Sequence, residues 1–293
     1  MRRKKERMQS DSQTPNDFLT RRQFVRNGAL LAGALPVSSL FGRAGFDTLL
    51  QSSDSAQDSP QATIQGSKIS LVNESITAEW NISSTGLQLM QIQDRRNNQA
   101  IDGPAPVFSL TFANGSQIIS SAMRIVVHPQ IEILSAQPRA ARYSERVSGR
   151  SVSATFEDAQ HGLRAQWRAI LRENSHYIRQ EIEFSAMKDR LPITEVVMLD
   201  LAVADAEVSG AVKGSPVTSG AWFFGFEHPL SESSATNGRL RCTLARQLPL
   251  EHDRSASYSS VVGVTATGQL RRDFLRYIER ERAHPYRTFL HYN

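Results

Sequence analysis

The sequence holds a single cysteine, Cys242, among its 293 residues, which excludes an intramolecular disulfide framework and any metal site built from several cysteines. It contains no glycine-rich phosphate loop, no HExxH metal-binding motif and no GxSxG nucleophile elbow. Glu251, His252 and Asp253 are consecutive, so an extended chain turns their side chains to different sides and a solvated loop is expected. We therefore predict no metal ion and no other cofactor, and we expect Cys242 to be a small buried core residue.

Excess positive charge is confined to the amino-terminal region. The whole chain carries 34 Lys and Arg residues against 29 Asp and Glu residues, a formal net charge of +5. Residues 1–44 contain nine of the basic and three of the acidic residues, so the remainder of the chain has a net charge of −1. The body of the protein therefore offers no electrostatic reason to bind phosphate backbones, and no nucleic-acid partner is predicted.

An arginine pair near the amino terminus precedes a stretch of small and apolar residues. Arg21 and Arg22 are followed by Phe24 and then by residues 28–41, which carry no charge. This stretch is shorter than the roughly 20 residues that span a bilayer. The pattern in residues 1–44 resembles a twin-arginine signal peptide, which implies export by the twin-arginine translocon to the periplasm or the extracellular space, with no stable membrane span after processing. The alternative is a chance arginine pair before a buried helix.

Short strand patterns fill residues 68–266, after a segment at 45–67 whose richness in serine, glutamine and aspartate predicts a flexible linker. Apolar and polar residues alternate over 76–82 and over 163–171, which is typical of half-buried strands. The Asn-Gly dipeptide at 114–115 lies between two apolar runs and predicts a hairpin. The fold class predicted for this region is all-β, a single large antiparallel β-sandwich.

The pattern changes near the carboxyl terminus. Apolar residues recur at helical spacing over 269–283, with Thr267 as a possible N-cap, and Pro285 ends the predicted helix. Residues 288–292 then have the pattern of a strand. A strand at this place suggests that a further domain follows, and the alternative is an ordinary carboxyl-terminal edge strand.

Three short motifs of the carboxyl half form an ordered series: residues 214–217, residues 222–229 and residues 284–293. Together they resemble the boundary between the galactose-mutarotase-like sandwich and the catalytic barrel of retaining, melibiase-type α-galactosidases. The resemblance implies a supersandwich over residues 68–266. It implies that residues 267–293 form a linker helix and the first strand of a truncated (β/α)8 barrel.

The same resemblance leaves this chain without catalytic residues. Retaining hydrolysis needs two carboxyl groups about 5–5.5 Å apart, and in that family both sit on later barrel strands. We therefore expect a non-catalytic, carbohydrate-associated module at the amino-terminal side of an exported glycoside hydrolase. One alternative is a self-contained exported sandwich that binds carbohydrate or is purely structural. A weaker one is mutarotase activity, for which adjacent Glu227 and His228 are a poor acid–base pair.

Four residues are predicted to contact a galactoside-type oligosaccharide. Trp222 offers an aromatic face for a sugar ring, while Glu227 and His228 offer hydrogen bonds to hydroxyl groups. By the resemblance, Asn293 would stand at the end of the first barrel strand, where barrel sites form. The alternative is a core strand followed by a polar turn, which we favour for Phe224 and Phe226. For Trp222, Glu227 and His228 we weigh the two interpretations equally.

Overall fold

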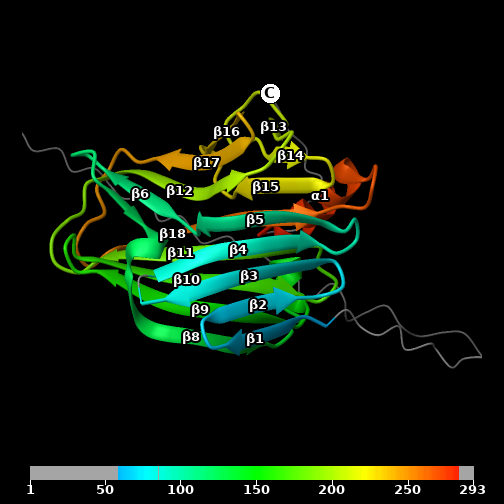
Figure 1. Ribbon diagram of the computed structural model, residues 1–293, viewed down its shortest axis with the longest axis horizontal. Coiled ribbons are helices and arrows are strands. Elements are labelled where there is room, and N and C mark those ends of the chain that lie inside the picture. The colour runs from blue at the N-terminus through cyan, green and yellow to red at the C-terminus, as the bar shows by residue number, and fades with distance from the viewer. Residues whose placement is uncertain (1–58, 85, 284–293) are drawn as a thin grey trace, which may run out of the picture. The chain divides into compact units, whose positions relative to one another are not determined.

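The computed structural model describes residues 59–84 and 86–283, and within them the chain forms three antiparallel sheets and one α-helix (Figure 1). The first sheet is a meander in the order β1-β2-β3-β4-β5. Its strands are β1 (Gln61–Gln65), β2 (Lys68–Val72), β3 (Ile76–Ser83), β4 (Gly86–Asp94) and β5 (Gln99–Pro106).

The largest sheet has eight strands in the order β13-β14-β15-β18-β11-β10-β9-β8. Its strands are β8 (Arg124–Leu134), β9 (Gly149–Asp158), β10 (Leu163–Arg172), β11 (Tyr177–Ala186), β13 (Glu207–Val208), β14 (Val217–Ser219), β15 (Trp222–Phe226) and β18 (Ser255–Val264). The third sheet has the order β16-β17-β12-β6-β7. Its strands are β6 (Ser109–Phe112), β7 (Gln117–Ile119), β12 (Ile193–Ala202), β16 (Glu232–Thr236) and β17 (Arg239–Ala245).

The core lies between the eight-stranded sheet and the two five-stranded sheets. Trp80 of β3 meets Trp167 of β10 edge-on, with ring centroids 5.3 Å apart. The Trp167 indole N–H donates to the side-chain oxygen of Gln180 on the neighbouring strand at 3.0 Å. The buried indole N–H and the buried amide oxygen therefore each have a hydrogen-bond partner. On the third sheet, Cys242 is fully buried in the same core, as expected, and burial raises the pKa of its thiol to about 11.

The predicted all-β class and antiparallel sandwich are confirmed, together with a helix near the carboxyl end of the described chain. The hairpin predicted at 114–115 joins β6 and β7, and Gly115 adopts a positive φ of 83° there. Two boundaries differ from the prediction. The sandwich begins at β1, inside the predicted linker, because alternate residues of β1 pack against the core while the strand pairs with β2.

The helix α1 spans Leu270–Glu281 and begins one residue later than predicted. Thr267 is not its N-cap: the Thr267 hydroxyl donates to the side-chain oxygen of Asn97 at 2.8 Å, and Gln269 takes the cap position without a side-chain hydrogen bond. In the part of the chain that the structure describes, no helix has the length and apolar character needed to cross a bilayer. The predicted signal peptide, most of the predicted linker and the predicted strand at 288–292 lie outside the described residues.

Candidate functional site

The face of the eight-stranded sheet that points away from the core is polar. Along β10, the odd-numbered residues 163–171 are buried against the other sheets. Side chains alternate along a strand, so the even-numbered Arg164, Gln166 and Arg168 point to the opposite face. The same alternation on β9, β11 and β18 places serine, threonine, glutamate and arginine beside them.

Strand register arranges these polar side chains in two rows across the sheet. The first row contains Ser153, Arg168, Glu181 and Ser259. The second row contains Thr155, Gln166, Glu183 and Ser257. Neighbouring members of a row are close enough to interact, and each row contains both hydrogen-bond donors and acceptors.

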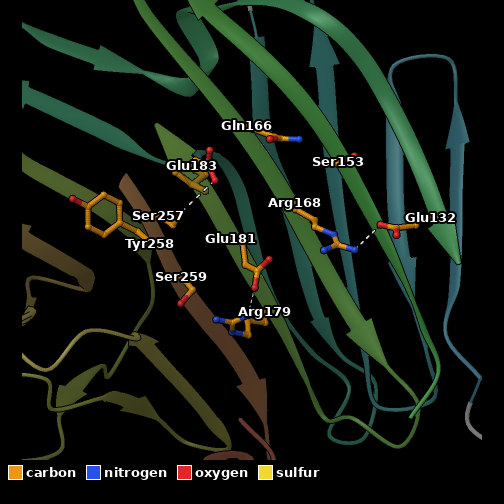
Figure 2. A pocket seen from close by; sticks show the side chains of 11 residues that line it. Glu132, Ser153, Gln166, Arg168, Arg179, Glu181, Glu183, Ser257, Tyr258 and Ser259 are labelled. Atoms are coloured by element: carbon orange, nitrogen blue, oxygen red, sulfur yellow. Dashed lines mark hydrogen bonds and ion pairs between the residues drawn. The ribbon is translucent and has the colours of Figure 1, made fainter. Parts of the chain in front are cut away.

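A hollow of about 510 Å³ opens over the two rows, and we call it the central hollow (Figure 2). It is lined mainly by Glu132, Ser153, Gln166, Arg168, Arg179, Glu181, Glu183, Ser257 and Ser259. Figure 2 shows that the Tyr258 side chain turns away from these groups. Its ring packs with Phe184 and Phe226, with centroid separations of 6.0 and 5.8 Å, so it supplies no aromatic face to the hollow.

Part of the hydrogen-bonding capacity of the central hollow is unused. Arg168 pairs with Glu132 at 2.5 Å, an ion pair in which both side chains are solvent-accessible, and such pairs contribute little to stability. Within the described chain, the side chain of Gln166 has no hydrogen-bond partner, and Glu183 accepts only a long bond of 3.4 Å from Ser257. A ligand can therefore bind Gln166 and Glu183 without breaking a strong internal contact, whereas Arg168 also donates to the Ser151 hydroxyl at 3.1 Å.

At one end of the outer face, the sheet becomes apolar and α1 covers it. Tyr177, Phe223 and Val261 on the sheet pack with Phe274 and Tyr277 on the helix. The Phe223 ring lies edge-on to Phe274 with centroids 5.3 Å apart, and it lies 5.4 Å from the Tyr277 ring. These contacts fix α1 against the sheet and define where the open surface ends.

A charged cluster centred on Arg179 lies at the border between the covered and the open surface. The Arg179 Nε donates to Glu227 at 2.6 Å and lies 3.9 Å from Glu281. The hydroxyl of Tyr277 donates to Glu227 at 2.7 Å, and the hydroxyl of Tyr177 donates to Glu281 at 2.7 Å. Burial alone would lower the pKa of Arg179, but the surrounding carboxylates outweigh it and raise this pKa. For Tyr177 and Tyr277, burial and the nearby carboxylates both raise the pKa.

The predicted contact residues are only partly brought together. Glu227 and His228 line one hollow of about 590 Å³ beside α1, which we call the helix hollow. Glu227 is held by Arg179 and by the helix, so it ties α1 to the sheet. The His228 Nδ1 accepts a bond from the backbone N–H of Leu230 at 3.2 Å, in a turn after β15.

Trp222 lies apart from the helix hollow. Its side chain is only 4% exposed, and its ring stacks with that of Phe224 inside the core, at a centroid distance of 6.2 Å. This burial favours the core alternative for Trp222, and Phe224 is buried as expected. Asn293 lies outside the described residues. Sugar contact by Trp222, Glu227, His228 and Asn293 stays a prediction.

The sequence reasoning missed the side chains of the central hollow. Gln166 and Arg168 are polar positions of the strand whose apolar positions the alternation over 163–171 had located, and Glu181 and Glu183 lie opposite them on β11. The available signal was that both strands place long polar groups on the same face. As expected, Glu251, His252 and Asp253 lie in an exposed loop. Among the described residues, no cluster of three or more histidine, cysteine, aspartate or glutamate side chains is arranged to hold a metal ion.

Comparison with known proteins gives distant structural similarities only. No protein-family model matches the sequence, and no curated protein matches it significantly. The GH36 α-galactosidase AgaB from Geobacillus stearothermophilus is similar over 71% of this chain and 41% of its own, with 12% identity and a TM-score of 0.48. The galactosidase domain of the α-galactosidase–sucrose kinase AgaSK is similar over 71% and 42%, with 8% identity and a TM-score of 0.48.

A YidC insertase is similar over 75% of this chain and 44% of its own, with 10% identity and a TM-score of 0.44. This chain therefore spans less than half the length of each of these three structures.

Proposed function

We propose that this chain is a non-catalytic, carbohydrate-binding β-sandwich module of an exported, α-galactosidase-like glycoside hydrolase. We place its sugar-binding site in the central hollow. The observation that carries the proposal is the pair of polar rows, in which some hydrogen-bond donors and acceptors have no strong partner within the described chain. The volume of about 510 Å³ lies within the range of roughly 300–1,000 Å³ typical of small-molecule sites.

The chemistry of the lining favours a neutral, polyhydroxylated ligand. Each sugar hydroxyl both donates and accepts a hydrogen bond, and the hollow offers donors on Arg168, acceptors on Glu183 and both on Gln166. The glutamates outnumber the arginines in the lining, which disfavours a strongly anionic ligand. A wholly apolar ligand would leave these groups without partners, and this costs free energy.

The proposal assigns binding, not turnover, to the central hollow. Glu132 and Glu181 are each engaged in an ion pair with an arginine. A retaining glycosidase instead needs one carboxyl group that can donate a proton to the leaving oxygen. We therefore expect the purified 293-residue chain to bind sugar without hydrolysing aryl α-galactosides, and measurable hydrolysis that survives further purification would contradict this.

The binding proposal is tested by calorimetric titration of the 293-residue chain with galactose and with α-galactosides. Gln166→Ala and Arg168→Ala should each weaken binding about fivefold or more, since a lost hydrogen bond costs about 1 kcal/mol. Gln88→Ala is the matched control, because Gln88 lies on β4 in a different sheet. Absence of binding by the unaltered chain, or equal affinities for all three variants, would overturn the proposal.

Export is proposed from residues outside the described structure. Replacing Arg21 and Arg22 by lysine keeps the charge but removes the guanidinium groups, so the precursor should stay in the cytoplasm. Cell fractionation measures this directly. Undiminished export of the double variant would refute the twin-arginine assignment while leaving the binding proposal intact.

A further inference from the structure

The central hollow adjoins hollows on both sides of it, with which it shares lining residues. On one side it shares Gln166 and Glu183 with a hollow of about 250 Å³, which also includes Arg164 and Ser185. Arg164 and Ser185 also line the next hollow, of about 410 Å³, which reaches the loop at residues 253–255.

On the other side, the central hollow shares Arg179 and Ser259 with the helix hollow. We call these four adjoining hollows together the sheet groove.

The sheet groove runs along β11. The outward-facing residues of this strand within the groove extend from Arg179 to Ser185. At about 3.4 Å per residue, these six steps span roughly 20 Å. The helix α1 bounds one end of the groove, and the other end opens at the loop that contains Arg254. The groove is therefore longer than a single sugar ring requires.

We propose that the sheet groove binds an extended oligosaccharide several units long, which lies along β11 from the α1 end toward Arg254. This inference rests on the proposed function and adds the length and direction of the ligand.

The sheet groove bears charges of both signs along its length. Arg164, Arg168 and Arg179 are interspersed with Glu181 and Glu183. No long run of one sign faces the ligand, so a polyanion gains little net attraction. Hydroxyl groups, in contrast, can bond to both kinds of side chain.

Strand pairing argues against an extended peptide as the ligand. Peptides recognised in extended form commonly add to a free sheet edge, where unpaired backbone groups supply the hydrogen bonds. The groove lies mainly over β9, β10, β11 and β18, each of which has a neighbour on both sides, and the edge strand β8 contributes only Glu132 to its lining. Side chains must therefore supply the hydrogen bonds, and they do so equally well for hydroxyl groups.

The test is calorimetric titration of the 293-residue chain with two series of sugars of increasing length, which we call ladders. One ladder is galactose, melibiose, raffinose, stachyose and verbascose, and the other runs from glucose to maltopentaose. In at least one ladder, affinity should rise tenfold or more with length and then level off. Equal affinity for the monosaccharide and the longest member would overturn this inference and leave the proposed function standing. Absence of binding to any sugar would overturn both.

Variants locate the added contacts within the groove. Arg164→Ala, beyond the central hollow, should weaken binding of the longest ligand about tenfold and leave monosaccharide binding unchanged. Arg164 is a solvent-exposed arginine that pairs with Glu157 at 3.6 Å. Arg239→Ala is the matched control, because Arg239 is also a solvent-exposed arginine in an ion pair but lies on β17. Thermal unfolding of both variants checks that each is folded. An Arg164 variant that binds long ligands normally, or an extended peptide that binds in an Arg164-dependent way, would overturn the inference.

Discussion

The two ends of the outer face of the eight-stranded sheet differ although the same strands form both. Under α1 the outward residues are Tyr177 on β11 together with Val261 and Gly263 on β18. A few positions away on these strands, beyond Arg179, they are glutamates on β11 and serines on β18. One sheet face therefore changes from a packing surface to a hydrated one within a few residues. Alternation identifies which side chains share a face, while their chemistry indicates what covers that face.

The two ends also differ in what their side chains contribute. The covered end is a closed aromatic cluster in which Phe223 is fully buried, so its contacts stabilise the fold. The open end consists of accessible side chains such as Ser257, which makes one long bond to Glu183, and Gln166, which makes no hydrogen bond within the described chain. Mutations should therefore affect stability at the covered end and ligand affinity at the open end.

The largest effect is expected for Phe223→Ala at the covered end. Removing the ring leaves a cavity between β15 and α1, and such a change typically costs about 3–5 kcal/mol of unfolding free energy. Urea denaturation followed by tryptophan fluorescence measures the loss. Phe223→Leu fills more of the space and should cost less. A loss below about 1 kcal/mol in the alanine variant would mean that α1 contributes little by packing there.

A pH-dependent loss of stability is expected from His176, which lies beside the same cluster. Burial, with a smaller effect from Arg96, lowers the pKa of His176 to about 4, while its hydrogen bond to the Asp273 backbone carbonyl partly offsets this. The unfolded chain binds a proton near pH 6.5, so stability is unaffected above that pH and falls as the pH drops from 6.5 toward 4. The loss should reach about 3 kcal/mol at pH 4.

Denaturation curves between pH 7 and 4 test this dependence. His176→Gln should flatten it in that range, because the side chain no longer titrates. The matched control His252→Gln lies in the exposed loop and should keep the slope of the unaltered protein. Equal slopes for the His176 variant and the unaltered protein would exclude His176 as the cause. Asp273, whose pKa is lowered by hydrogen bonds from Ala266 and Arg272 despite burial, contributes only near and below pH 4.

Much of the fold could be predicted because the strands alternate clearly. Residues 163–171 have buried apolar groups at every second position, and the sequence marks their faces without further information. The strand β1 was missed because only Ala62 and Ile64 pack against the core, and the surrounding polar composition resembles a linker. The packing of α1 was also beyond prediction, since it depends on outward-facing aromatics from strands distant in sequence.

The site was harder to predict because local patterns do not specify long-range neighbours. Residues 222–224 are three successive aromatics, and the strand turns the middle one, Phe223, toward α1 and the outer two into the core. Glu227 looked available for a ligand because its partners are remote: Arg179 is 48 positions away and Tyr277 is 50. The central hollow likewise arises from five strands, β8, β9, β10, β11 and β18, and only the sheet topology brings them together.

A smaller effect should distinguish two glycines that share the outer face at the covered end. A Cβ on Gly263 would lie 2.1 Å from the Phe223 ring, whereas a Cβ on Gly225 would lie 3.5 Å from the nearest atom, on Val261. Gly263→Ala should therefore cost about 1–3 kcal/mol through overpacking. Gly225→Ala is the matched control and should be neutral or slightly stabilising. Equal effects of the two substitutions on the urea midpoint would contradict this account of ring packing over Gly263.

The smallest stability effect is expected for Ser257→Ala at the open end. The Ser257 side chain is exposed and its single bond, to Glu183, is long at 3.4 Å, so the unfolding free energy should change by less than about 0.5 kcal/mol. Loss of a hydroxyl from the central hollow should still weaken sugar binding severalfold, because one hydrogen bond is worth about 1 kcal/mol. Parallel denaturation and calorimetric titration separate the two quantities. Stability loss comparable to that of Gly263→Ala would contradict the difference between the two ends, since it would mean that the open end also holds the fold together.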